Sequence, residues 1–145
     1  MGKFIITILI SSVFLFGIDL RKSGDTVVDK KNNLIWQDHV HNVKVIVTHE
    51  HAIEYCEKLI QSGSSSWRVP TVEEYSYIID KSRVKEELMI NKAFYHVKQD
   101  DYWAADRTWI RNFGRYAYYV FLKSGAIYYQ NRTYPKYIRC VRDIK

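Results

Sequence analysis

Short alternations of apolar and polar residues mark the two ends of this chain, and helical spacing marks its middle. Val27 and Val28 precede the polar run KKNN, and Leu34 to Trp36 follow it, which predicts a β-hairpin. The next apolar segment, VKVIV at residues 43–47, is compatible with a short strand or with a loop packed on the core.

A first helix is predicted to begin at Thr48. Apolar residues then recur every three or four positions, which gives the helix one buried face. This face consists of Ala52, Tyr55, Cys56, Leu59 and Ile60. Gly63 stands where such a helix is expected to stop.

The stretch WRVPTVEEYSYII, which starts at Trp67, predicts a second helix with a defined beginning. Thr71 and Glu74 match the T-x-x-E capping box, in which each side chain accepts a hydrogen bond from a backbone N–H. The guanidinium of Arg68 needs a carboxylate or carbonyl partner in such apolar surroundings. We expect a structural clamp formed by Trp67, Arg68, Pro70, Thr71 and Glu74. A ligand contact by Arg68 is the alternative.

The rest of the chain favours antiparallel strands. Tyr75, Ile78 and Ile79 complete the second helix, and residues 81–100 show no clear pattern. Beyond them, apolar alternation and a turn at Ser124 predict β structure. The predicted strands are YWAAD (102–106), YAYYVFL (116–122), IYYQ (127–130) and YIRCVRD (137–143). A hairpin, two helices and then strands predict the α+β fold class.

The first 17 residues are typical of an export signal. Lys3 precedes 13 mostly apolar residues, fewer than the roughly 20 that a membrane-spanning helix needs. Gly17 is a small residue suited to cleavage. We therefore expect a signal peptide at 1–17 and a single domain at 18–145, periplasmic, secreted or on the cell surface. An uncleaved segment that anchors the chain in the membrane is the alternative.

Export changes how the two cysteines are interpreted. An oxidising compartment favours a disulfide between Cys56 and Cys140, which would close a loop of more than 80 residues. In the chain-entropy model this contributes about 4 kcal/mol to stability. Neither cysteine belongs to a C-x-x-C pair of the kind found in zinc sites. A free reactive thiol is the alternative.

Positive charge and aromatic side chains concentrate after residue 100. There, nine basic residues stand against three acidic ones, which accounts for the whole net charge of +6. The stretch WIRNFGRYAYY places arginines among aromatics, a combination that can stack on sugar rings and pair with anionic groups. The candidate ligand-binding residues are Trp109, Arg111, Arg115 and Arg132. Alternatively, the alternating tyrosines reflect only a strand pair that is covered on both faces.

Because export argues against nucleic acid, we expect the partner to be an acidic glycan or a protein of the cell envelope or surface. No cofactor is predicted. The sequence has no nucleophile elbow and no phosphate-cradling glycine loop, and the adjacent Asp100 and Asp101 make a poor acid and base pair. We therefore expect a protein that is not an enzyme.

Four histidines fall within 13 residues: His39, His41, His49 and His51. In a strand, alternate residues share a face, so each pair could present two imidazoles to zinc or copper. The H-E-x-x-H protease motif is absent, because Ile53 stands where its second histidine would be. Surface histidines near a helix start are the expected interpretation, and a metal site is the alternative.

Five segments together resemble one known family. VVDKKNNLIWQD, AIEYCEKL, SSWRVPTVEEY, YWAAD and YIRCVRD, in this order, resemble the Lcl C-terminal domain family over roughly Asp25 to Asp143. The resemblance implies an exported bacterial domain whose fold is similar to C-type lectins and formylglycine-generating enzymes. It thus implies a C-type-lectin-like α+β domain with two helices packed on an antiparallel sheet and one disulfide.

The sequence departs from the functional motifs of both fold relatives. Formylglycine-generating enzymes use a downstream cysteine pair, whereas only Cys140 lies downstream of Trp67. Calcium-dependent lectins use Glu-Pro-Asn or Gln-Pro-Asp, whereas Pro70 and Pro135 lie in VPT and YPK. The resemblance therefore implies a scaffold for a non-catalytic binding or adhesion module. The alternative is a structural subunit of a surface assembly.

Overall fold

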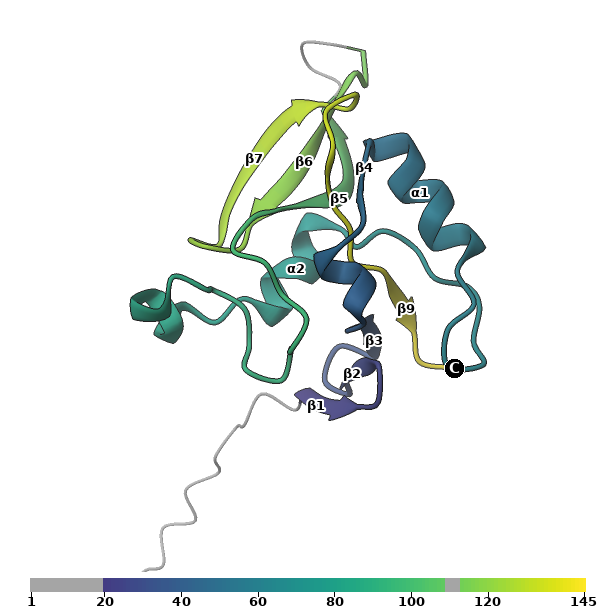
Figure 1. Ribbon diagram of the computed structural model, residues 1–145, viewed down its shortest axis with the longest axis vertical. Helices are drawn as coiled ribbons and strands as arrows, with labels where there is room; N and C mark the ends of the chain where they lie inside the picture. Colours follow the sequence, from purple (N-terminus) through teal and green to yellow (C-terminus); the bar gives the residue numbers. More distant parts are fainter. Residues whose placement is uncertain (1–19, 109–112) are drawn as a thin grey trace, which may run out of the picture.

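The computed structural model describes residues 20–108 and 113–145 (Figure 1). The expected signal peptide, residues 1–17, lies outside the described residues. Within the described ranges, no helix is long and apolar enough to cross a membrane.

Among the residues that the structure describes, two β-sheets and two α-helices make up the fold, as the α+β prediction requires. The first sheet has the order β1-β2-β3-β9, and all of its pairs are antiparallel. Its strands are β1 (Leu20–Ser23), β2 (Thr26–Asp29), β3 (Leu34–Gln37) and β9 (Val141–Asp143). The predicted hairpin is therefore confirmed as β2 and β3, with Val28 opposite Ile35.

The second sheet has the order β4-β8-β5-β6-β7. Its strands are β4 (Ile46–Val47), β8 (Lys136–Tyr137), β5 (Asp101–Thr108), β6 (Tyr116–Phe121) and β7 (Ala126–Asn131). The pairs are antiparallel except for β5 and β8, which run parallel. The expected single antiparallel sheet is thus two sheets, one of which is mixed, and β7 lies at an edge of the second.

Both helices begin at the threonine that the sequence indicates. Thr48 caps α1 (His49–Lys58), and Thr71 caps α2 (Val72–Ile78) with the complete capping box. Two short 3-10 helices, η1 (Val40–Val43) and η2 (Lys81–Glu86), connect the remaining elements. Figure 1 shows the second sheet in the upper half of the view, with α1 to its right and the first sheet below.

The second sheet carries apolar side chains on both faces because its residues alternate between two clusters. Tyr102 and Val120 are buried in the cluster that includes α2 and the first sheet, whereas Trp103 and Ala117 are buried with α1. Strand alternation requires this division, since neighbouring residues point to opposite faces.

The predicted disulfide is present. Cys56 of α1 and Cys140 are bonded, with their Cα atoms 5.6 Å apart. The bond joins α1, which packs on the second sheet, to the segment between β8 and β9, which leads into the first sheet.

Two predictions about local structure are wrong. YIRCVRD is not one strand, because the chain leaves the second sheet after β8 and joins the first at β9, with Cys140 in the crossing. Ile60 is 78% exposed, since α1 ends at Lys58 and Leu59 is already extended, well before Gly63. For the segment 43–47, which the sequence left open between a short strand and a loop, the structure shows a short strand, the two-residue β4.

Replacing both cysteines tests the contribution of the bond. We expect the Cys56→Ala/Cys140→Ala variant to lose about 4 kcal/mol of unfolding free energy, because the unfolded chain regains the freedom of a long loop. Urea denaturation at equal temperature measures the loss, and the reduced wild type is the matched control. An unchanged midpoint would show that the crossing segment is held by its other contacts alone.

Candidate functional site

A cleft of about 460 Å³ opens where α1 begins, beside the β6–β7 hairpin. It is lined by Thr48, Glu50, His51, Arg115, Asn131, Arg132 and Thr133. Two of the four residues predicted to bind ligand, Arg115 and Arg132, therefore lie together in it. The other two, Trp109 and Arg111, lie outside the described residues.

Strand pairing brings the two arginines together. Arg115 directly precedes β6 and Arg132 directly follows β7, and the N–H of Arg132 donates to the carbonyl of Arg115 at 2.9 Å. At the end of β7, the side chain of Asn131 accepts hydrogen bonds from the N–H and the hydroxyl of Thr133, at 3.0 and 2.9 Å. These contacts define the wall of the cleft that the hairpin supplies.

His49 holds Arg132 against the first turn of α1. The N–H of His49 donates to the carbonyl of Arg132 at 3.0 Å, and the Nε of Arg132 lies 3.0 Å from the His49 Nδ1. The His49 Nε2 lies 2.8 Å from the carbonyl of Ala104, and the imidazole packs edge-on against Trp103. Since Arg132 Nε can only donate, the His49 tautomer carries its proton on Nε2.

The charges around this pair favour a neutral imidazole. The pKa of His49 is lowered to about 4, chiefly by burial and also by the positive charges of Arg132 and Arg107, against the opposing effects of the Ala104 carbonyl and Asp106. Burial also lowers the pKa of Arg132, with Arg107 acting in the same direction and Glu50 opposing. Arg107 thus adds a third positive charge close to the cleft.

The donor set of the cleft suits an anion. The Nε–H of Arg132 donates to His49, whereas its two terminal guanidinium nitrogens have no hydrogen-bond partner among the described residues. Arg115 is exposed, and Thr48, Asn131 and Thr133 offer neutral polar groups. A planar guanidinium with open terminal nitrogens binds carboxylate, sulfate or phosphate in a bidentate manner.

The four histidines do not share one face. His39 and His41 flank the start of η1, His49 is buried, and His51 is exposed at the cleft. The strand geometry assumed for each pair is therefore wrong, because the residues lie at 3-10 and α-helical turns. Within the described residues, no group of three or more histidine, cysteine or acidic side chains is placed to hold a metal ion.

Arg68 forms ion pairs with two carboxylates, those of Glu74 and Asp143. Its guanidinium donates to both carboxylate oxygens of Glu74, at 2.8 and 2.7 Å, and to Asp143 at 3.0 Å. The side-chain bond from Glu74 raises the pKa of Arg68, and its contact with Asp143 acts in the same direction. The backbone of Arg68 also pairs with that of Val141. These contacts connect the start of α2 to β9.

The other members of the expected clamp lie around the same junction. Trp67 is buried, and its indole N–H donates to the carbonyl of Ser64 at 3.0 Å. The carbonyl of Pro70 accepts a hydrogen bond from Ala105 of β5 at 2.7 Å. The hydroxyl oxygen of Thr71 accepts a hydrogen bond from the N–H of Glu74.

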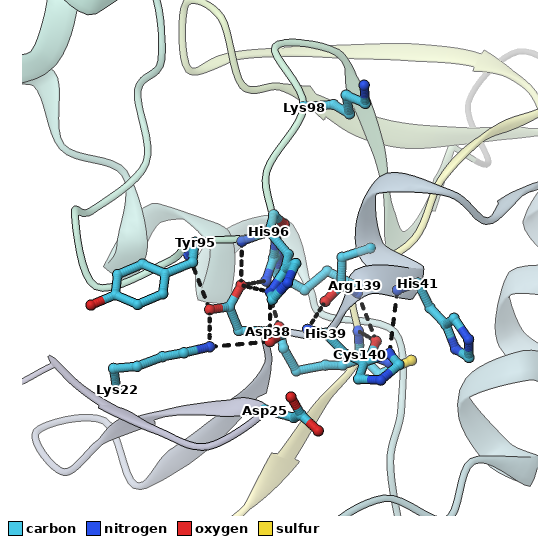
Figure 2. Close-up of polar contacts among 12 residues, drawn as sticks. Lys22, Asp25, Asp38, His39, His41, Tyr95, His96, Lys98, Arg139 and Cys140 are labelled. Atoms are coloured by element: carbon cyan, nitrogen blue, oxygen red, sulfur yellow. Dashed lines mark hydrogen bonds and ion pairs between the residues drawn. The ribbon is translucent and has the colours of Figure 1, made fainter.

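A second charged cluster, centred on Asp38, was not indicated by the sequence. Figure 2 shows its carboxylate surrounded by Lys22, by the backbone of Tyr95 and His96, and by Arg139. Asp38 and Arg139 are both fully buried, 3.4 Å apart. Burial opposes ionisation of Asp38, but the bond from Lys22 and the charge of Arg139 outweigh it and lower its pKa. The ion pair of Asp38 and Arg139 at its centre is closed to solvent, which indicates a structural role.

Removing the counterion tests this role. We expect Asp38→Asn to lower the free energy of unfolding by about 3–5 kcal/mol, because it leaves the buried Arg139 guanidinium without a negative partner. Urea denaturation measures the loss. Asp25→Asn, at an exposed position just before β2, is the matched control and should unfold like the wild type. Equal stability of the two variants would contradict the structural role.

His49 predicts a pH dependence of stability. The unfolded chain protonates His49 near its ordinary pKa of 6.5, whereas the folded protein resists protonation down to about 4. Between these values the unfolded state binds more protons, so the free energy of unfolding falls with falling pH, by up to about 3 kcal/mol from this residue. A His49→Gln variant should lose that slope, and the exposed-site control His51→Gln should retain it.

Comparison with known protein families gives one match. Residues 25–142 match the model of the Lcl C-terminal domain. Comparison with curated proteins gives no match. The match spans far more than half of the 145-residue chain and includes the five segments on which the resemblance rests, apart from Asp143 at the end of the fifth. The chain therefore belongs to the Lcl C-terminal domain family.

Proposed function

We propose that this domain is a non-catalytic binding module of the bacterial periplasm or cell surface, and that it takes an acidic ligand in the cleft at the start of α1. The supporting observation is the anchored guanidinium of Arg132. Its Nε is held by a neutral, buried His49, so the guanidinium is positioned in advance while its two terminal nitrogens have no hydrogen-bond partner among the described residues and are available to a ligand.

An acidic glycan is the preferred ligand. The cleft volume lies within the range of small-molecule sites, and its arginines supply charge while its threonines and asparagine can bond to hydroxyl groups. Tyr134, which directly follows the cleft residue Thr133, is exposed and offers an aromatic surface to a sugar ring. The likeness to C-type lectins stays a prediction from the resemblance.

A charge reversal at Arg115 tests the site. We expect Arg115→Glu to weaken binding to heparin and to polygalacturonate at least 10-fold, because it replaces an attractive charge with a repulsive one at an exposed position. Isothermal titration calorimetry measures the binding, and the wild-type affinity should fall steeply as salt rises. Neutral dextran should not bind.

The matched control reverses charge elsewhere. Arg21 is also exposed, but it lies on β1, at the opposite end of the molecule from the start of α1 (Figure 1). Arg21→Glu changes the net charge equally and should bind nearly as the wild type does. Equal weakening by both variants would reveal a nonspecific charge effect and overturn the cleft as the site.

The alternative function, a structural subunit of an envelope assembly, is supported by a different surface. Ile127, Tyr128 and Tyr129 are consecutive residues of β7, and each has about half of its surface exposed, at 47%, 50% and 51%. Exposed apolar residues of this kind are typical of protein contacts.

A further inference from the structure

The strands at the sheet edges of the described residues differ in how they are protected from pairing with other chains. Natural proteins protect edges with charges or by keeping the strand short. β1 carries Arg21 and Lys22, β9 has three residues of which two are charged, and β4 has only two residues. β7 has six residues, with neither charge nor proline, and pairs with β6 in an unbroken register. It is the unprotected edge.

Two central residues of β7 direct their backbone N–H groups away from β6. Arg132 donates its N–H to Arg115, so these residues form a hydrogen-bonded pair of the antiparallel ladder. Such pairs alternate along the ladder, which turns the N–H of Tyr128 towards β6 and those of Ile127 and Tyr129 away from it. A further strand would bond to these outward groups.

A groove lies beside the same edge. It has a volume of about 480 Å³ and is formed by residues of α2 and the sheet, including Ile79, Val120, Gly125 and Ile127. Tyr129 lies opposite Tyr118, on the same face as Ile127. A strand added to β7 would therefore direct one side chain towards the groove and another, two residues away, towards Tyr129.

We propose that β7 receives an extended segment of another protein as an additional strand, with apolar side chains at alternate positions and acidic residues at the end next to Arg132. Charge supports this choice of partner. Arg115 and Arg132 lie at one end of β7, and the whole chain carries a net charge of +6. An acidic end on the partner complements both.

A second copy of this chain fits less well. Antiparallel pairing of two β7 strands about a twofold axis would bring Arg132 of one copy to the turn of the other, where Lys123 lies. Two chains of charge +6 also repel each other. The occupant is therefore a segment of a different protein, and self-association is a competing outcome of the test.

The probe is a synthetic peptide of nine residues in which valine and isoleucine alternate with threonine, with two glutamates at its N-terminus. Antiparallel addition places those glutamates beside Arg132. Upon titration into ¹⁵N-labelled protein, we expect hydrogen exchange of the Ile127 and Tyr129 amides to slow at least 10-fold. The Tyr128 amide, which already faces β6, should change little. The control peptide is N-methylated at alternate residues, so it keeps its side chains but cannot donate hydrogen bonds to β7.

Two variants test the edge itself. Ile127→Lys places a charge on the strand and should weaken peptide binding at least 10-fold, and Tyr129→Pro should do the same by removing an outward N–H. Because proline can disturb the hairpin, heparin binding by each variant reports whether the cleft is intact.

The two proposals share Arg132 but can fail separately, since strand addition depends on the backbone groups of β7 and anion binding depends on the side chains of the cleft. Equal binding of the methylated peptide, no protection of Ile127 and Tyr129, or no binding at millimolar peptide would overturn strand addition. If these amides become protected at high protein concentration without peptide, the edge pairs with a second copy of this chain. That result would also overturn strand addition by a different protein.

Discussion

The crossing from β8 to β9 is the segment on which the other parts of this fold depend. Within it, Cys140 is bonded covalently to α1, and the neighbouring Arg139 forms a fully buried ion pair with Asp38. The guanidinium of Arg139 also donates to the carbonyls of Gln37 and His96, which belong to two other parts of the chain. One short segment therefore fixes the first sheet, the second sheet and α1 relative to one another.

These fixed contacts explain how a small domain can present a cleft at the junction of distant segments. The cleft wall from α1 and the wall from the hairpin are far apart in the chain, and His49 and Arg132, whose contact joins them, are 83 residues apart. Because α1 is bonded to the crossing and the hairpin belongs to the sheet that the crossing leaves, neither wall is free to move independently. A rigid site spends little binding energy on ordering its side chains.

The neutral state of His49 connects stability and recognition. A charged imidazole would repel the adjacent Arg132 and could no longer accept the hydrogen bond from its Nε–H, so burial of His49 supports the proposed anion site as well as the fold. The proposed site at the β7 edge differs from the cleft, because its binding groups are backbone atoms and the side chains of β7 carry no charge. The cleft and the β7 edge adjoin at Arg132. An acidic partner bound at one of them therefore reduces the positive charge that attracts an anion to the other.

The sequence by itself determined the local features of this protein. The capping threonines, the β2–β3 hairpin and the Thr71–Glu74 box were predictable because each depends on residues close together in the chain. The disulfide was predictable because only two cysteines exist. The family followed from the order of five short segments.

Tertiary structure alone decided the rest. The break within YIRCVRD, the burial of Asp38 with Arg139, and the contact between His49 and Arg132 all join residues far apart in sequence, for which periodicity carries no signal. The histidine motif shows the same limit: His49 became a buried support and its neighbour His51 a cleft residue. His49 and His51 are two positions apart on a helix, so their side chains point in different directions. Only the packing of α1 on the sheet determines which of them is covered.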